Sequence, residues 1–245
     1  MAITTVLFDL DGTLLPMDQE LFIKTYLQRL GGYLANYGYE PKPFLDGLWK
    51  SIGAMMKNTS SKTNEVVFWE SFCAIFGEKA REDEPLFDAF YRTDFQKVQE
   101  VCGFDPLAAV AVNRAKELGF RVVLATNPVF PAVATQSRIR WAGVDPADFE
   151  WITTYENSIS AKPNPIYYNR LLEQLGLTAV ECLMVGNDVE DDMIVRTLGM
   201  ETFLLTNWLI NEKNADTSVY PQGGYEELLA FLERVKSSKK EQNPS

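Results

Sequence analysis

Histidine is absent from the 245 residues of this chain. Its absence excludes Ser-His-Asp triads, Cys-His nucleophile pairs and zinc sites that use histidine ligands. Chemistry in this protein must therefore come from carboxylates, lysine, hydroxyl groups, backbone amides or a bound metal ion.

Cysteine is also scarce. Cys73, Cys102 and Cys182 lie far apart and are odd in number, so they form neither a disulfide framework nor a CxxC metal or redox motif. No apolar stretch approaches the roughly 20 residues of a membrane span, and residues 1–8 lack the pattern of a signal peptide. We therefore expect a reduced, cytoplasmic location.

Basic residues are outnumbered by acidic ones. The chain has 23 Lys and Arg against 34 Asp and Glu, a formal net charge of −11. This balance argues against a nucleic-acid partner and against binding to an anionic membrane surface. Any phosphorylated substrate must be held by a few placed cations, because the chain has no general positive field.

Short apolar runs alternate with helical patterns over much of the chain. The runs are bounded by polar or small residues, which favours buried parallel strands at 3–8, 121–125, 151–152, 182–185 and 202–205. Apolar residues at helical spacing predict helices at 106–118, 129–141, 165–175 and 191–198. This alternation predicts an α/β fold with a doubly wound parallel sheet.

The region 18–99 breaks that alternation. It predicts helices at 18–37, 42–56, 64–76 and 85–95, with no convincing strand among them. A crossover between parallel strands needs only about a dozen residues, so residues 17–99 are expected to form an inserted helical domain. The alternative is that these helices cover one face of the sheet. With the inserted helical domain, residues 1–16 and 100–236 are expected to form the sheet domain, and residues 237–245 a solvated, mobile tail.

Two acids follow the first predicted strand. Asp9 and Asp11 stand two positions apart, in a turn that Gly12 relaxes, at the sheet edge where ligands bind in open α/β folds. Their mutual repulsion is costly without a cation between them, and Mg²⁺ prefers such oxygen ligands. Taken alone, the pair is equally compatible with capping acids in a solvated loop.

Polar residues also follow the second strand and precede a later helix. Thr126 and Asn127 can bind phosphoryl oxygens through a hydroxyl and an amide, although Thr-Asn-Pro is also an ordinary helix start. Lys162 stands directly before two prolines in a loop ahead of a helix, where a lysine is more often a solvated charge than a functional one.

The segment 186–192 is dense in acids and directly follows the fourth strand. Asp188, Asp191 and Asp192 repel one another unless a metal or a lysine offsets their charge. All four polar elements follow core strands on one edge of one sheet, and that co-occurrence favours a single functional site.

These elements resemble the four motifs of the haloacid dehalogenase (HAD) superfamily, which span nearly the whole predicted sheet domain. The first motif, D-x-D-G-T after an apolar strand, is highly specific. Its counterparts here are Asp9, Asp11, Gly12 and Thr13; those of the later motifs are Thr126, Lys162 and Asp188 with Asp191 or Asp192.

The resemblance implies roles for these residues. Asp9 would attack phosphorus and become an aspartyl phosphate, and Asp11 would protonate the leaving oxygen and then activate water. Mg²⁺ would be held by the Asp9 carboxylate, the Asp11 carbonyl and Asp188. Phosphoryl oxygens would be bound by Gly12, Thr126, Asn127 and Lys162, and Lys162 would also balance the charge of Asp9.

The fourth motif departs from the commoner Gly-Asp start, because Asn187 stands between Gly186 and Asp188. Counting forward from Asp188 makes Asp192 the supporting acid. Counting back from Gly199 instead selects Asp191 and puts Asn187 in the metal position. We favour Asp188 and Asp192.

The insert between the first two motifs resembles a class I helical cap, and the whole pattern implies a phosphatase acting on a small phosphorylated metabolite. A phosphomutase shares the same residues, and a 2-haloacid dehalogenase or a non-catalytic module are further alternatives. Asp11 argues against the dehalogenase, because relatives that displace halide lack an acid there. Carbon–halogen cleavage delivers no proton to an alkoxide.

No residue of the predicted cap identifies the substrate. Lys50 and Lys57 can meet an anionic substrate, but solvated helix faces explain them more often. A set of aromatic side chains at helical spacing favours packing over ligand stacking: Phe68, Trp69, Phe72 and Phe76.

Overall fold

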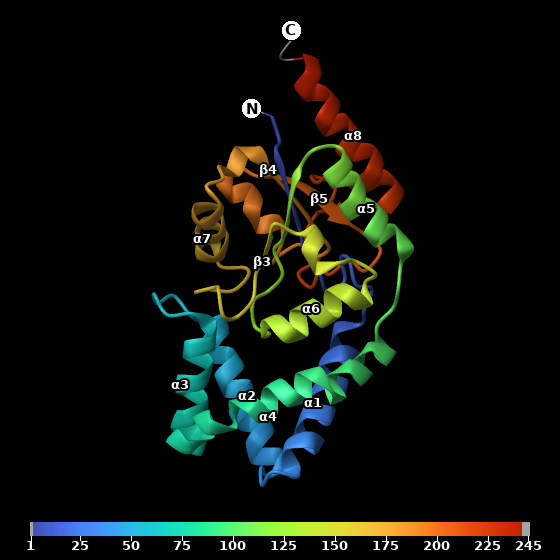
Figure 1. The fold of residues 1–245 in the computed structure, drawn as a ribbon. Coiled ribbons are helices and arrows are strands. Elements are labelled where there is room, and N and C mark those ends of the chain that lie inside the picture. Colours follow the sequence, from blue (N-terminus) through green and yellow to red (C-terminus); the bar gives the residue numbers. More distant parts are fainter. Residues whose placement is uncertain (1, 242–245) are drawn as a thin grey trace.

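The computed structural model describes residues 2–241, and Figure 1 shows their arrangement. Within them, six strands form one parallel sheet in the order β3-β2-β1-β4-β5-β6. The strands are β1 (Thr5–Phe8), β2 (Arg121–Leu124), β3 (Trp151–Ile152), β4 (Cys182–Gly186), β5 (Glu201–Leu205) and β6 (Gln222–Gly223). The predicted doubly wound parallel sheet is confirmed.

Strand β1 lies inside the sheet and pairs with β2 on one side and β4 on the other. Phe8 is the register partner of both Leu124 and Val185, so the three strands end at one level. Side chains alternate between the faces of a strand. Accordingly Phe8 packs with one apolar cluster, and Leu7 with a second cluster on the opposite face.

Helices cover both faces. On one side α5 (Pro106–Glu117) packs against α8 (Tyr225–Glu241), and on the other α7 (Pro165–Leu175) packs against the 3₁₀ turn η5 (Met193–Leu198). The start of α7 follows from its sequence: Asn164 accepts a hydrogen bond from the Ile166 amide at 3.0 Å, and Pro165 occupies the first turn. Gly176 ends the helix in the left-handed conformation.

The segment between β1 and α5 is helical. It contains α1 (Gln19–Ala35), α2 (Pro41–Met56), α3 (Asn64–Phe76), α4 (Glu84–Arg92) and the 3₁₀ segments η1 (Glu78–Asp83) and η2 (Asp94–Val101). Figure 1 shows α1 to α4 gathered at one end of the molecule, with α6 (Ala132–Trp141) between them and the sheet. Its packing is strongly aromatic: the Phe72 ring lies 4.6 Å from that of Phe76 and 5.5 Å from that of Phe87. The domain boundaries drawn from the sequence stay a prediction.

Several predicted helices differ from those observed. The helix predicted at 129–141 begins only at Ala132, because residues before Pro131 are held out of the helical conformation. The helix predicted at 85–95 divides into α4 and η2 at Thr93, whose hydroxyl donates to the Ala89 carbonyl at 2.7 Å. The helix predicted at 191–198 is the 3₁₀ turn η5.

The tail expected from 237 begins inside α8, because residues 237–241 continue that helix; its mobility stays a prediction, and residues 242–245 lie outside the described part of the chain. A helix already nucleated on an apolar face extends into polar residues at little cost. Neither α8 nor β6 was predicted. No helix in residues 2–241 is long and apolar enough to cross a membrane.

Asn64, the first residue of α3, joins the helical insert to two loops of the sheet domain. Its buried side-chain amide donates to the carbonyls of Pro128 and Ser160, each at 3.0 Å. Its side-chain oxygen accepts from Asn58 at 2.9 Å. These loops directly follow β2 and precede α7, so one side chain fixes the insert against both.

Asn64→Ala should lower the free energy of unfolding by about 2–4 kcal/mol, because two buried carbonyls lose their donor. Urea denaturation measures the change. Asn36→Ala is the matched control, since the Asn36 amide also donates to two carbonyls but at an exposed site. Water replaces those bonds, and the control should change stability by less than about 1 kcal/mol. Equal losses in the two variants would contradict the joining role of Asn64.

Candidate active site

A cavity of about 190 Å³ opens at the carboxyl ends of β1, β2 and β4. Most of the residues proposed from the sequence line it. These are Asp9, Asp11, Thr126, Asn127, Lys162, Asn187, Asp188, Asp191 and Asp192. The sheet register explains the gathering, because three adjacent strands end at one level and release their polar loops into one crevice.

Asp9 leaves β1 still bound to the sheet, since its amide donates to the Val185 carbonyl at 2.9 Å. Both carboxylate oxygens have a partner. Oδ1 accepts from Lys162 Nζ at 2.8 Å, and Oδ2 accepts from the Thr13 hydroxyl at 3.0 Å. The carboxylate is thereby oriented while it lines the cavity.

Lys162 is 1% exposed and is shared between two acids. Its ammonium donates to Asp9 Oδ1 at 2.8 Å and to Asp192 Oδ1 at 2.6 Å. Burial lowers the pKa of Lys162, but the carboxylates of Asp192 and Asp9 outweigh it, and the pKa lies well above its usual value. The lysine therefore stays charged between the two acids.

Asp11 is paired with a residue that the sequence analysis missed. Arg138 on α6 is fully buried and donates to Asp11 Oδ2 and, at 3.3 Å, to the Thr135 hydroxyl. Its guanidinium carbon lies 4.4 Å from the centre of the Phe130 ring. Burial raises the pKa of Asp11, and the charge of Arg138 opposes that rise.

One signal for Arg138 was present in the sequence. An arginine on the apolar face of a helix, beside Ile139 and near Trp141, is rarely buried without a charged partner. That signal does not identify the partner, because residues 11 and 138 meet only through the packing of α6 over the strand ends.

Thr126 and Asn127 follow β2. The Thr126 carbonyl accepts from the hydroxyls of Thr153 at 2.8 Å and Tyr167 at 3.0 Å, which fixes the loop. Asn127 Nδ2 donates to Asp191 Oδ2 at 3.3 Å, while its Oδ1 is buried without a partner in the part of the chain that is described. Both residues line the cavity.

Asn187, whose role the sequence left open, forms hydrogen bonds through both polar atoms of its side chain. Oδ1 accepts from the Thr13 hydroxyl at 2.9 Å, and Nδ2 donates to the Trp208 carbonyl at 2.6 Å. Gly12, with φ +83°, lies directly beneath this amide, and a Cβ at that position would overlap it. Asn187 therefore connects the loops after β1 and β4 through hydrogen bonds.

The two candidate supporting acids face different partners. Asp192 is 1% exposed and contacts Lys162, whereas Asp191 contacts Asn127. Asp188 accepts at Oδ1 from the amides of Glu190 (2.7 Å) and Asp191 (2.9 Å), which holds its carboxylate at the cavity. The contact with Lys162 favours the register in which Asp192 is the supporting acid.

The donor atoms at the cavity suit a hard cation. Within residues 2–241 no three His, Cys, Asp or Glu side chains form a cluster able to hold a metal by themselves. Magnesium commonly takes only one or two carboxylates and completes its shell with waters and substrate phosphate. The carboxylates of Asp9 and Asp188 with the carbonyl of Asp11 match that pattern. Asp11 Oδ1 is also buried without a partner among the described residues.

The charge of the cavity lining favours such an ion. The described lining holds five carboxylates, those of Asp9, Asp11, Asp188, Asp191 and Asp192, against the single ammonium of Lys162. A phosphate dianion would be repelled by this surface unless a cation first lowered its negative charge.

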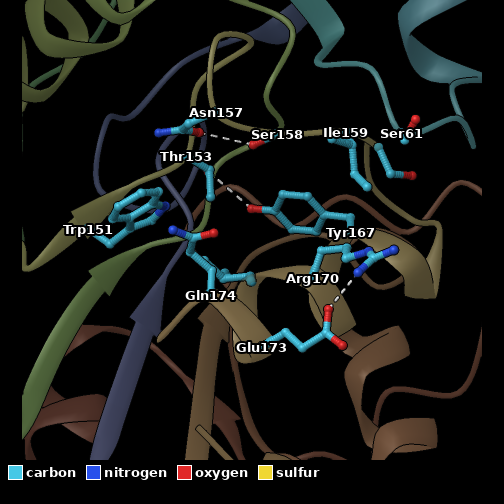
Figure 2. A pocket seen from close by; sticks show the side chains of 12 residues that line it. Ser61, Trp151, Thr153, Asn157, Ser158, Ile159, Tyr167, Arg170, Glu173 and Gln174 are labelled. Atoms are coloured by element: carbon cyan, nitrogen blue, oxygen red, sulfur yellow. Dashed lines mark hydrogen bonds and ion pairs between the residues drawn. The ribbon is translucent and has the colours of Figure 1, made fainter. Parts of the chain in front are cut away.

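A larger cavity of about 500 Å³ is lined by residues of β3, the loop 153–160 and α7, and Figure 2 shows its side chains. Thr153 and Tyr167 form its inner wall, with their hydroxyls 3.1 Å apart. The charged side chains in its described lining are Arg170 and Glu173, which pair with each other at 2.7 Å. Acids at strand ends are absent from the described lining of this cavity, so it has no counterpart of the carboxylate cluster around Asp9.

Comparison with known proteins finds a family model that covers most of the chain. Residues 3–195 match the family model of the haloacid dehalogenase-like hydrolases. Among curated proteins, the pyrophosphatase PpaX of Bacillus mycoides (strain KBAB4) is 26% identical over 239 residues, which cover 96% of this chain and 99% of that protein.

Solved structures share the fold over nearly the whole chain. A HAD phosphatase from Thermococcus onnurineus has a TM-score of 0.57 at 17% identity and covers 94% of this chain and 98% of its own. The defluorinating L-2-haloacid dehalogenase Rha0230 also has a TM-score of 0.57 at 17% identity, with coverages of 94% and 95%. The HAD-hydrolase YfnB from Bacillus subtilis, bound to magnesium, has a TM-score of 0.55 at 18% identity, with coverages of 95% and 100%.

Gly12→Ala should destabilise the protein by about 3 kcal/mol, because it combines left-handed backbone strain with displacement of the Asn187 amide. Gly38→Ala is the matched control: Gly38 has φ +94°, and a Cβ there meets nothing within 4 Å. The control isolates backbone strain and should cost about 1 kcal/mol. Chemical denaturation of both variants measures the difference, and equal losses would argue against close packing of Asn187 on Gly12.

Arg138→Met should lower the free energy of unfolding by about 3 kcal/mol, because Asp11 is left without its buried partner. Arg140→Met, on the exposed side of the same helix, should change it by less than about 0.5 kcal/mol. Adding Asp11→Asn to Arg138→Met should recover part of the loss, since no unpaired charge remains. Strictly additive effects of the two substitutions would contradict the pairing.

Proposed function

Because the chain belongs to the haloacid dehalogenase-like hydrolases, we propose that it is a magnesium-dependent phosphatase that hydrolyses a small phosphate monoester through an aspartyl phosphate. Its membership confirms the resemblance seen in the sequence. The observation that carries the proposal is the environment of Asp9: an oriented carboxylate, held by Lys162 and Thr13, with Asp11 two residues away in the same cavity.

In the first half of the reaction an Asp9 oxygen bonds to phosphorus while the bond from phosphorus to the ester oxygen breaks. The Asp11 carboxyl gives its proton to the departing oxygen, which leaves as an alcohol. Thr126, Asn127 and Lys162 bind the phosphoryl oxygens as the charge on them is redistributed.

In the second half, the Asp11 carboxylate takes a proton from water, and the water oxygen bonds to phosphorus. The bond between phosphorus and Asp9 breaks, which releases inorganic phosphate and restores the Asp9 carboxylate and the protonated Asp11 carboxyl. Magnesium held by Asp9, Asp188 and the Asp11 carbonyl would supply the positive charge that lets two anions approach each other.

Three further observations support phosphoryl transfer. The curated relative is named a pyrophosphatase, and one solved neighbour is titled a phosphatase. Another neighbour is titled as bound to magnesium. A dehalogenase is also among the solved neighbours, but Asp11 favours ester cleavage because only an ester oxygen needs a proton on departure.

The partner of this site is proposed to be a small phosphorylated metabolite. A cavity of about 190 Å³ lies below the ~300–1,000 Å³ typical of sites for drug-sized ligands. The net charge of −11 supports the absence of nucleic-acid and anionic-membrane partners. A cytoplasmic location stays a prediction from the sequence.

Asp9→Asn should reduce phosphate release from a panel of phosphate monoesters by at least about 10³-fold, because the nucleophile is removed. Chelation of magnesium should abolish activity in the unchanged protein, and added magnesium should restore it. Asp46→Asn, an exposed acid on α2, is the matched control and should leave turnover unchanged.

Full activity in Asp9→Asn would rule out the covalent mechanism. Conversion of a sugar phosphate to its isomer with little free phosphate, followed by ³¹P NMR, would instead identify a phosphomutase. Chloride release from a 2-haloacid at a comparable rate would identify a dehalogenase.

A further inference from the structure

Part of the lining of this cavity is apolar, and we call this part the apolar wall. Met17, Phe22, Ile23, Val129 and Phe130 form it, and Gln19 is its one polar member among the described lining residues. The remaining lining residues, which we call the floor, are acids, a lysine, a threonine and two amides. A phosphoryl group suits the floor, and the wall remains for the rest of the substrate.

This apolar wall is held in place by packing. The Phe130 ring lies 4.4 Å from the Arg138 guanidinium carbon, 5.2 Å from the Tyr26 ring and 6.2 Å from the Phe22 ring. Phe22 in turn contacts Phe95 edge-on at 6.4 Å. The wall is therefore a formed surface of the folded protein, and a ligand binds it without first ordering its side chains.

A second, smaller cavity of about 50 Å³ adjoins the first behind Val129 and Phe130, which line both. Its described lining contains no charged side chain. It is formed by residues of the helical insert and of the loops around 130 and 155, including Trp69 and Tyr91. Apolar surroundings thus continue past the wall in the direction of the insert.

Within the described linings of the two cavities, no free cationic side chain remains that could receive a second anionic group. Lys162 is the one cation in the described lining of the two cavities, and Asp9 and Asp192 already engage it. Arg138 is buried and bound to Asp11. Lys50 and Lys57 are exposed and belong to neither lining.

We infer that the substrate is the phosphate ester of a small, uncharged alcohol or phenol, whose apolar part lies against Met17, Phe22, Ile23, Val129 and Phe130. The inference rests on the proposed function. A second phosphate or a carboxylate at the wall would lose its hydration and gain no partner. This chain therefore differs from a relative named a pyrophosphatase, because both halves of pyrophosphate are anionic.

Two aryl phosphates that differ by one carboxylate test the inference. The kcat/KM of the unchanged protein should be at least about 30-fold higher for phenyl phosphate than for 4-carboxyphenyl phosphate, because one extra buried charge goes unpaired. Pyrophosphate should be a similarly poor substrate. A ratio near one, or a preference for either anionic compound, would overturn the inference.

Ile23→Arg places a cation on the wall and should reduce the phenyl to 4-carboxyphenyl preference by at least about tenfold. Ile23 is 37% exposed, so the larger side chain can be accommodated. Leu21→Arg is the matched control: it lies on the same helix, is 44% exposed and lines neither cavity, so the preference should stay unchanged.

Gln19→Lys provides a second cation at an exposed position of the same lining, should Ile23→Arg fail to fold. An unchanged preference in both lining variants would contradict the assigned wall. The proposed function and the proposed substrate class can be disproved separately. Absence of phosphate release from every ester would overturn the proposed function, whereas phosphate release with an anionic preference would overturn the substrate class alone.

Discussion

A single buried ammonium organises the site. Lys162 lies between Asp9 and Asp192, at 2.8 Å and 2.6 Å, and these residues come from loops before α7, after β1 and after β4. Two carboxylates cannot be buried this close together without a cation between them, and a buried lysine is equally costly without acids. The position of each of these three loops therefore depends on the positions of the other two.

Uncharged hydrogen bonds hold the same loops from the outside. The Thr13 hydroxyl lies within hydrogen-bond distance of both Asp9 and Asn187 and shares its one proton between them, and the Asn187 amide donates to the Trp208 carbonyl. Asn64 extends this network into the helical insert by bonding the loops that follow β2 and precede α7. A site assembled from several loops needs such connections, because each misplaced loop would leave buried polar groups unpaired.

The division of the cavity into a charged floor and an apolar wall separates chemistry from selection. The floor comes from strand ends of the sheet, where parallel strands direct polar loops to one edge. Much of the wall comes from the start of α1 and from the segment before α6, which differ in position and sequence from the motif residues. Substrate preference can therefore change through wall residues such as Ile23 while the reacting groups stay in place.

The sequence predicted the strand-helix alternation, the parallel sheet and the order of the polar loops. It could do so because apolar periodicity and turn residues are local signals that span a few positions. The helical character of the insert was readable for the same reason. Only the tertiary structure decided three contacts. These are the pairing of Arg138 with Asp11, the two hydrogen bonds of the Asn187 side chain, and the contact of Lys162 with Asp192, which distinguishes Asp192 from Asp191. Helix α8 was missed because its polar end looked solvated, although its first turns pack on β5. Local patterns determine which segments are helices or strands, whereas the contacts of Arg138, Asn187 and Lys162 join residues 21 to 174 positions apart and depend on how the segments pack.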